Sequence, residues 1–372
     1  MKITEVSAHH HGNALLVAVH TDSELIGVGE SGCWAYPEAV GQVVATFAEH
    51  LVGTEVSRIE HHWHMMWRMG PFRGAVIGAA VSAIDAALWD IAGQRHGVPT
   101  HQLLGGPYRD RIRLHRAVGG ADADALGEAA RAAAAEGFTA LKFNVTDTEV
   151  DGSVNELVAD AVARTTAVRD ATDGRVDLIV EIHRSLTPQQ VPAVLDALRP
   201  LRPLFVEDPI QIDTIDVQTG LLAHGLTLGL GERWQSPWEV REALAAHGPF
   251  VVRSDVNMAG GITAARKIAA IAEASHAQVS WHNWLSPVSD AATLTVDAVI
   301  PNLLTHEHFP AGLAVSDAIE TDWRVDDGHM LPPSTPGLGV RVAFDRLGHI
   351  DYLGRPLHEI PLRRDGSVAF AM

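Results

Sequence analysis

The sequence predicts an α/β protein: a (β/α) barrel with a second, α+β domain attached to it. Two observations carry this prediction. From Arg111 onward a unit of one short β-rich run and one alanine-rich helical stretch recurs eight times, and the residues before it follow a different pattern. Parallel strands need helical crossovers, so an unbroken alternation of this kind is typical of a barrel. A chain of 372 residues is long enough for a barrel and an attachment.

Residues 1–110 are expected to form the α+β domain. The run ALLVAVHTDSELIGVGE alternates strand and turn signals. A helix should follow, because apolar residues are then spaced by fours and threes as on one helix face: Ile77, Val81, Ile84, Leu88 and Ile91. We expect this helix to end near Gly97 and Pro99, a glycine and proline ending.

Residues 111–330 are expected to form the barrel. Each predicted strand ends in or near a polar residue and is followed by a helical stretch; the strands are RIRLHRAV, TALKFNV, DLIVEIH, PLFVED, TLGLGE, FVVRSDV, AQVSWH and NLLTHE. Residues 331–372 are rich in proline and glycine, and we expect them to return and pack on the first domain. No linker separates the parts, so the two domains are expected to share an interface.

The overall composition excludes several classes of protein. The chain carries 28 basic and 46 acidic residues, a formal charge of −18, which argues against binding to nucleic acid or to an anionic membrane surface. A single cysteine, Cys33, rules out an internal disulfide framework. The start of the sequence lacks a signal-peptide pattern, and we expect no segment long and apolar enough to cross a bilayer. The prediction is a cytoplasmic protein.

Six polar residues stand near the ends of successive predicted strands, 23 to 27 positions apart: Glu181, Glu207, Glu232, Asp255, His282 and Glu307. In a barrel these positions gather at one mouth, where active sites of this fold are built. The carboxylates of the first three would repel one another strongly unless a cation lay between them, and such hard oxygen ligands suit magnesium. Any one of these acids alone is equally well explained as a solvated strand end or a helix cap. Three in register on adjacent strands predict a magnesium site.

Several motifs, in the right order and each at its own strand, resemble the enolase superfamily. They are VEIHR, FVEDP, GLGER, RSDVNMAGGIT and VSWHNWLSPV, with the earlier SAIDAALWDIAGQRHGVPTHQLLGG and the late PGLGV. They look most like the mandelate racemase-like group, and within it the galactonate dehydratase branch of acid-sugar dehydratases. The resemblance covers nearly the whole chain. It implies an enolase-like fold, in which both chain ends form a capping domain over a modified TIM-type barrel, with Mg held by Glu181, Glu207 and Glu232.

The resemblance also implies roles for four residues at the mouth. His282 is the expected base, and Asp255 would orient its ring and raise its basicity. Glu307 would hydrogen-bond to the substrate carboxylate as charge builds up, which requires Glu307 to be protonated or to share a proton. His183 lies two residues after Glu181, so strand alternation points both side chains to one face. The resemblance makes His183 the general acid that protonates the departing hydroxyl; the alternative is a group that only fixes a neighbouring carboxylate.

Four further residues are candidate substrate contacts. In the racemase and lactonising branches the second barrel strand carries two lysines separated by one residue, whereas this strand reads LKFNV. Lys142 remains as a candidate fixed charge beside the substrate carboxylate. Asn144 replaces the second base, because an amide does not take up a proton at neutral pH. Arg184 either contacts distal hydroxyls or is an exposed loop residue, and Trp284 either lines the pocket or is an ordinary core residue.

From these residues we expect a hydro-lyase that uses magnesium and dehydrates an acid sugar, a galactonate-like aldonate, to a 2-keto-3-deoxy acid. The α-proton beside a carboxylate is weakly acidic, so the cation is needed to stabilise the enediolate formed when the proton leaves. One alternative is an epimerase or cycloisomerase of an acid sugar, which Asn144 disfavours. Another is a barrel that has lost catalysis and serves as a binding protein. The expected partner is a small-molecule acid sugar, and we expect a homo-oligomer.

Overall fold

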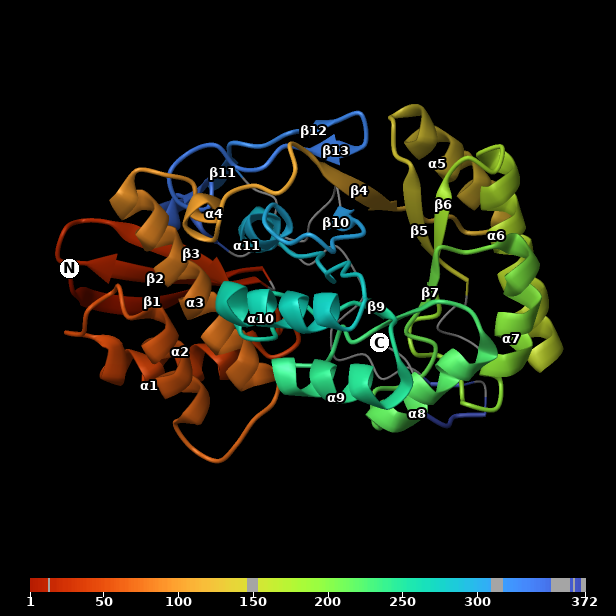
Figure 1. The fold of residues 1–372 in the computed structure, drawn as a ribbon, viewed down its shortest axis with the longest axis horizontal. Helices are drawn as coiled ribbons and strands as arrows, with labels where there is room; N and C mark the ends of the chain where they lie inside the picture. Colours follow the sequence, from red (N-terminus) through yellow and green to blue (C-terminus); the bar gives the residue numbers. More distant parts are fainter. Residues whose placement is uncertain (13, 146–152, 309–316, 349–361, 364, 369–372) are drawn as a thin grey trace.

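The computed structural model describes residues 1–12, 14–145, 153–308, 317–348, 362–363 and 365–368. Figure 1 shows a smaller part that carries the N-terminus beside a larger part built around a barrel. The elements of the smaller part are β1 (Ile3–His11), β2 (Ala14–Thr21), β3 (Ile26–Glu30), α1 (Pro37–Leu51), α2 (Ile59–Arg68), α3 (Ala75–His96) and α4 (Thr100–Leu103). The three strands form an antiparallel sheet, against which α1 and α3 pack.

The central helix of the smaller part, α3, corrects one expectation from the sequence. The helix expected over residues 77–91 is present, and it ends as predicted, with Gly97 in the left-handed conformation at a φ of 67°. Gly27 and Gly29 on β3 admit the helix closely, because a Cβ at either position would lie 2.0 Å from a carbonyl oxygen of α3. By length and composition α3 could cross a membrane, which was not expected. Since 72% of its most apolar stretch is buried inside the protein, α3 is a core helix.

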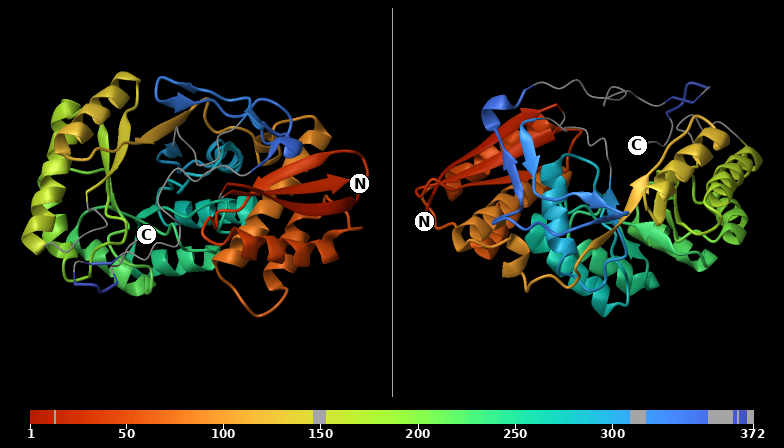
Figure 2. Two further views of the ribbon diagram at one scale, coloured as in Figure 1. Left: turned by 180° about the vertical axis from the view of Figure 1, so that it is seen from behind. Right: turned by 90° about the horizontal axis from the view of Figure 1, so that it is seen from above.

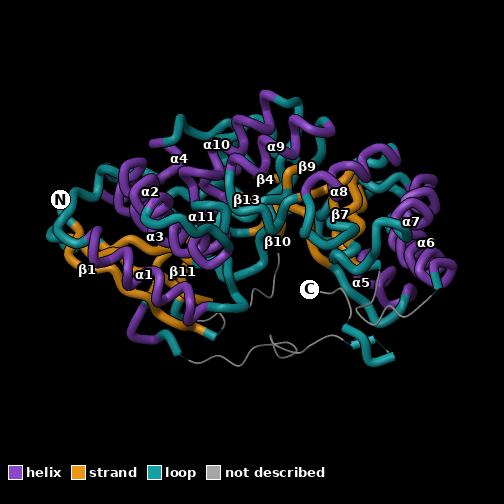
Figure 3. The backbone as a smooth tube through the Cα atoms, turned by 90° about the horizontal axis from the view of Figure 1, so that it is seen from below, coloured by secondary structure: helices purple, strands orange, loops and turns teal. Residues whose placement is uncertain are grey.

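The larger part is a closed parallel barrel, which confirms the predicted fold class. Its elements are β4 (Ile112–Ala117), α5 (Ala123–Ala135), β5 (Ala140–Asn144), α6 (Val154–Ala171), β6 (Asp177–Glu181), α7 (Val191–Leu198), η1 (Arg199–Leu201), β7 (Phe205–Glu207), α8 (Ile215–Gly220), η2 (Leu221–His224), β8 (Leu228–Leu230), α9 (Pro237–His247), β9 (Val251–Val252), α10 (Gly261–Ala274), α11 (Pro287–Asp297) and β10 (His306–His308). Figure 3 shows the helices outside the strands.

Neighbouring strands of the barrel pair over different numbers of residues. Neighbouring strands pair in parallel from β4 to β9, and β10 pairs with β4. Between β9 and β10 the expected strand around Val279 makes isolated parallel bridges, from Val279 to Val252 and to Leu303 and from His282 to Asp255. Eight strand positions of the described chain therefore form the barrel. The position around Val279 makes too few ladder hydrogen bonds to count as a regular strand.

The C-terminal segment contacts both parts. It contains β11 (Ile319–Thr321), β12 (Val325–Asp326), β13 (His329–Met330), β14 (Val340–Val342) and η3 (Phe344–Arg346), drawn in blue beside the smaller part in Figure 2. β13 pairs with the start of β4, whereas the Leu338 N–H donates to Asp90 on α3 at 2.8 Å. The division at residues 110 and 330 stays a prediction. Residues 349–361, 364 and 369–372 of the last segment lie outside the described residues.

Carboxylates of the smaller part cap helices of the barrel and so join the two parts. Asp85 on α3 accepts hydrogen bonds from the backbone N–H of Thr263 at 2.9 Å and from its hydroxyl at 2.6 Å, at the start of α10. Glu30, which ends β3, accepts from the N–H of Ser289 at 2.9 Å and from the Ser286 hydroxyl at the start of α11. Because the first N–H groups of a helix lack internal partners, these carboxylates satisfy them and hold the smaller part over the barrel.

We expect Asp85→Ala to lower the free energy of unfolding by about 2–3 kcal/mol, because the Thr263 donors would stay buried without an acceptor. The matched control is Asp122→Ala, which removes the exposed N-cap of α5, where Asp122 accepts from the Ala125 N–H. That change should cost about 1 kcal/mol. Urea unfolding of both variants measures the difference, and equal losses would contradict a joint at Asp85.

Candidate active site

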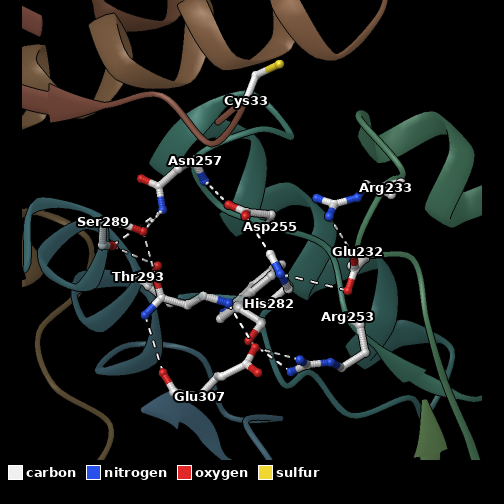
Figure 4. A network of polar contacts seen from close by, with 12 residues as sticks. Cys33, Glu232, Arg233, Arg253, Asp255, Asn257, His282, Ser289, Thr293 and Glu307 are labelled. Carbon is white, nitrogen blue, oxygen red and sulfur yellow. Dashed lines mark hydrogen bonds and ion pairs between the residues drawn. The ribbon is translucent and has the colours of Figure 1, made fainter. Parts of the chain in front are cut away.

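The six residues predicted at the strand ends gather at one end of the barrel. Each is at most 6% exposed: Glu181, Glu207, Glu232, Asp255, His282 and Glu307. Glu181 and Glu207 end β6 and β7 and are partners in the sheet register. Figure 4 shows the other four close together at the same end. The strand ends therefore bring residues that are far apart in the sequence around one buried space.

Three of these residues form a group that fits a metal ion. Glu181, Glu207 and Glu232 each offer one carboxylate oxygen, and the three oxygens lie within 4.8 Å of one another. Oε2 of Glu207 is buried and has no hydrogen-bond partner within the described part of the chain. A buried carboxylate oxygen without a partner is costly, whereas a hard cation such as Mg²⁺ would use it. These three residues are the ones that would hold the ion.

Lys142 on β5 lies among the carboxylates. Its Nζ is 2.9 Å from Oε2 of Glu181, 2.8 Å from Oε1 of Glu207 and 2.9 Å from Oε1 of Glu307. Burial alone would lower the pKa of Lys142, but these carboxylates raise it above its ordinary value. A lysine held in this way suits a fixed positive charge and not a base. Asn144, two residues on and on the same face of β5, is exposed.

Arg184 is not an exposed loop residue, which excludes one of the two alternatives from the sequence. Its side chain is 2% exposed, and Nη1 lies 2.6 Å from Oε1 of Glu232 and 3.4 Å from Oδ2 of Asp208. The chain reaches this position through a turn in which His183 and Arg184 are both left-handed, with φ of 55° and 63°. Such backbone costs roughly 1–2 kcal/mol per residue. Nη2 has no partner among the described residues and is a donor left for a substrate hydroxyl.

His282 and Asp255 form the expected pair. Nδ1 of His282 is 2.8 Å from Oδ2 of Asp255, whose other oxygen accepts from the Asn257 N–H at 2.7 Å. With the ring proton on Nδ1, where Asp255 accepts it, Nε2 is unprotonated and available as a base. Nε2 lies 3.8 Å from Oε2 of Glu232, so the His282 ring lies at the edge of the three-carboxylate group (Figure 4).

Three donors surround Glu307 in the substrate-free site. Oε2 accepts from Nη2 of Arg253 at 2.6 Å and from the Asn283 N–H at 3.0 Å, and Oε1 accepts from Lys142 at 2.9 Å. Burial alone would raise the pKa of Glu307, but Arg253 and Lys142 hold it well below its usual range. In the substrate-free site Glu307 is therefore a hydrogen-bond acceptor at both oxygens, and the proton that its expected role requires stays a prediction.

His183 reaches the site by a different route from the one expected. Because β6 ends at Glu181, strand alternation does not extend to His183, which lies in the left-handed turn. Its backbone N–H, and not its ring, donates to Oε1 of Glu181 at 2.7 Å. Burial, followed by the charge of Arg184, lowers the pKa of His183 to about 4. The ring is therefore neutral near pH 7, and a role as an acid requires substrate binding to raise that pKa.

A loop of the smaller part forms one side of the mouth. Trp34, which follows β3, packs edge-on against Trp284 with ring centroids 5.3 Å apart. The guanidinium of Arg233 lies 6.0 Å from the Trp34 ring. Figure 4 shows Cys33 of the same loop above the site. Trp284 is half-buried and its Nε1 has no hydrogen-bond partner within the described residues, so it retains a donor at this wall.

Sequence reasoning missed two arginines of the site. Arg233 follows Glu232 and lies 2.9 Å from its Oε1, and Arg253 lies two residues before Asp255. A signal was present, because a charge inside the apolar run FVVRSDV at an inward position needs a buried partner. Among the described residues, and apart from histidines, the acids of the site outnumber its cations: Glu181, Glu207, Asp208, Glu232, Asp255 and Glu307 against Lys142, Arg184, Arg233 and Arg253.

Comparisons with known proteins agree with this geometry. The chain matches the mandelate racemase/muconate lactonizing enzyme N-terminal domain over residues 2–105 and the enolase C-terminal domain-like family over residues 125–346. D-galactonate dehydratases of Variovorax paradoxus (strain S110) and Xanthomonas oryzae pv. oryzae (strain PXO99A) are each 35% identical to it, over 99% of this chain and 100% of theirs.

Solved structures are similar over most of the chain. An enolase of Agrobacterium radiobacter, assigned provisionally as a galactarate dehydratase and bound to Na and L-malate, has a TM-score of 0.89 at 26% identity and covers 100% of both chains. A provisionally assigned dehydratase of Salmonella enterica serovar Typhimurium has a TM-score of 0.86 at 29% identity, over 93% of this chain and 97% of its own.

We expect Arg184→Leu to destabilise the substrate-free protein by about 3–5 kcal/mol, because Glu232 and Asp208 would lose a buried cation. The control is Arg175→Leu, which removes an ion pair with Asp173 that is 79% and 74% exposed. Exposed pairs contribute little, so the control should unfold at the parent urea concentration. A loss for Arg184→Leu no larger than that of the control would refute the buried contact.

Proposed function

This chain belongs to the mandelate racemase/muconate lactonizing enzyme group of the enolase superfamily, and from that premise we propose that it is a magnesium-dependent hydro-lyase that dehydrates an acid sugar. The observation that carries the proposal is the close approach of the His282–Asp255 pair to the three-carboxylate group, with Nε2 of His282 3.8 Å from Glu232. A base beside a cation site is what removal of a weakly acidic α-proton requires.

Glu181, Glu207 and Glu232 are the proposed metal ligands. Magnesium bound there would supply positive charge that stabilises the enediolate left when the α-proton departs. Lys142 supplies a second positive charge from the protein itself, and its position among Glu181, Glu207 and Glu307 places it beside the proposed ligands. We propose that it contacts the substrate carboxylate.

His282 is the proposed base. Asp255 accepts the Nδ1 proton, which leaves the Nε2 lone pair for the α-proton and stabilises the imidazolium that forms. No second base is expected on the opposite face of the substrate's α-carbon. β5 presents the amide of Asn144 there, and Lys142 is held as a cation. This arrangement favours elimination over racemisation.

His183 is the proposed acid for the departing hydroxyl. Hydroxide is a poor leaving group, so a proton must reach the β-oxygen as its bond to carbon breaks. The pKa of His183 is about 4 in the substrate-free site, where burial lowers it. A bound carboxylate would raise that pKa and favour the protonated ring. The elimination leaves an enol, which gains a proton at carbon to give the 2-keto-3-deoxy acid.

The proposed substrate is a galactonate-like aldonate. Support comes from the D-galactonate dehydratases that match the chain over 99% of its length. Glu307 is proposed to hold Lys142 and Arg253 in place through its contacts with both. The cytoplasmic location and the homo-oligomeric state stay predictions.

The proposal is tested by incubating the protein with a library of acid sugars and measuring keto-acid formation. We expect a galactonate-like aldonate to react, excess chelator to abolish turnover, and Mg²⁺ to restore it. Glu207→Gln should lower the rate at least about a hundredfold, because it removes a proposed ligand. Glu128→Gln, an exposed change on α5, is the control and should react at the parent rate. Full turnover in chelator would rule out the metal, and no keto acid from any acid sugar would rule out the dehydratase.

The two histidines are distinguished by exchange of the α-proton in heavy water, followed by proton NMR. His282→Asn should lose both dehydration and exchange, because the base is gone. His183→Asn should dehydrate at least about a hundredfold more slowly but keep exchange, since base and cation site remain. His96→Asn, an exposed change at the end of α3, is the control. If His183→Asn dehydrates at the parent rate, another group is the acid; if it loses exchange too, the two roles are wrongly assigned.

A further inference from the structure

Arg253 is held rigidly inside the barrel. It follows β9 and is 0% exposed, and its backbone N–H donates to the Leu230 carbonyl at 2.8 Å. Nη1 donates to the carbonyl oxygens of Ser280 at 2.7 Å and Trp281 at 3.0 Å. A planar guanidinium anchored by two backbone carbonyls keeps one orientation, which the flexible ammonium of a lysine does not.

The other nitrogen of the fork joins two acids of the site. Nη2 lies 2.8 Å from Oε1 of Glu207 and 2.6 Å from Oε2 of Glu307. Lys142 contacts the same two carboxylates from the mouth, so acids and cations alternate around a closed ring of four groups. Oε1 of Glu207 is thus engaged by both cations, and Oε2 is the oxygen without a hydrogen-bond partner among the described residues.

The neighbouring strand leaves space for this arginine. A Cβ at Gly229 on β8 would lie 2.6 Å from the Phe205 ring and 3.1 Å from Cγ of Arg253. The guanidinium also lies 6.0 Å from the centroid of that ring, within the range of a cation–π contact. Glycine at position 229 therefore allows both side chains to occupy the barrel interior, where a larger residue would displace one of them.

We propose that Arg253 is a positioning residue, whose guanidinium fixes Glu207 with Oε2 turned toward the metal ion and fixes Glu307 in the same contact. The inference rests on the proposed function, since it takes Glu207 as a metal ligand. Arg253 acts through the two carboxylates and does not touch the substrate. Lys142 does not replace it, because its ammonium is shared among three carboxylates and has no backbone anchor within the described part of the chain.

The test is Arg253→Lys, which keeps the charge and removes the fork. A lysine cannot bridge two carboxylates and two carbonyls at once, so Mg²⁺ should bind about tenfold or more weakly. Isothermal titration of the substrate-free protein with Mg²⁺ measures this without any turnover. The matched control is Arg169→Lys, because Arg169 also donates to backbone carbonyls, of Val176, Leu201 and Arg202, but stands outside the site. The control should bind Mg²⁺ as the parent does.

Parent-like affinity in Arg253→Lys would overturn the proposal, because charge alone would then suffice. An equal loss in the control would also overturn it, because the effect would be general loosening. If Arg253→Lys does not fold, Arg253→Gln decides: losing a nearby cation should tighten Mg²⁺ binding by Coulomb's law, so weaker binding supports positioning and unchanged or tighter binding overturns it. If the parent binds no Mg²⁺, the metal proposal fails by itself. In that case, crystal structures of the parent and of Arg253→Lys test the role of Arg253. If the Glu207 and Glu307 carboxylates occupy the same positions in both, the role of Arg253 is overturned.

Discussion

Mutual repulsion among buried carboxylates is the constraint on which the rest of the site depends. Two like charges 4 Å apart repel by about 4 kcal/mol at an effective dielectric of about 20, and several such pairs meet at this barrel mouth. Three cations reduce this repulsion, and each of them contacts more than one acid: Lys142, Arg184 and Arg253. Arg184 even adopts a left-handed backbone to reach its partners. Oε2 of Glu207 is left without a hydrogen-bond partner among the described residues, which fits a site for a divalent cation between the three glutamates.

The two parts of the fold contribute differently to the site. Barrel strands end in the acids and bring them into register, as at Glu181 and Glu207. The smaller part covers the mouth from one side through Trp34 and its loop, and the buried carboxylates of Glu30 and Asp85 hold it there by capping barrel helices. Covering the mouth keeps bulk water from screening the charges, so each ion pair and the proposed enediolate contact are stronger than they would be in an open cleft.

The barrel and its ring of polar strand ends could be predicted from sequence because they depend on local periodicity and on one repeated spacing. What could not be predicted depends on contacts between distant strands. Arg253, 54 positions before Glu307, is one of the cations that lower the pKa of Glu307, and nothing in the local sequence indicates this contact. Arg184 was considered as a loop residue, yet a turn sends it back to Glu232. The apolar composition of α3 was misjudged for a related reason, since only its burial identifies it as a core helix.

The central claim is that the three strand-end glutamates at the barrel mouth bind one divalent cation between them. Anomalous diffraction from crystals soaked in Mn²⁺, an electron-rich substitute for Mg²⁺, tests this directly because it locates the ion without relying on activity. The account predicts one strong peak per chain, within bonding distance of carboxylate oxygens of Glu181, Glu207 and Glu232. A difference map without a peak at these residues, or with its main peak elsewhere in the protein, would contradict the account.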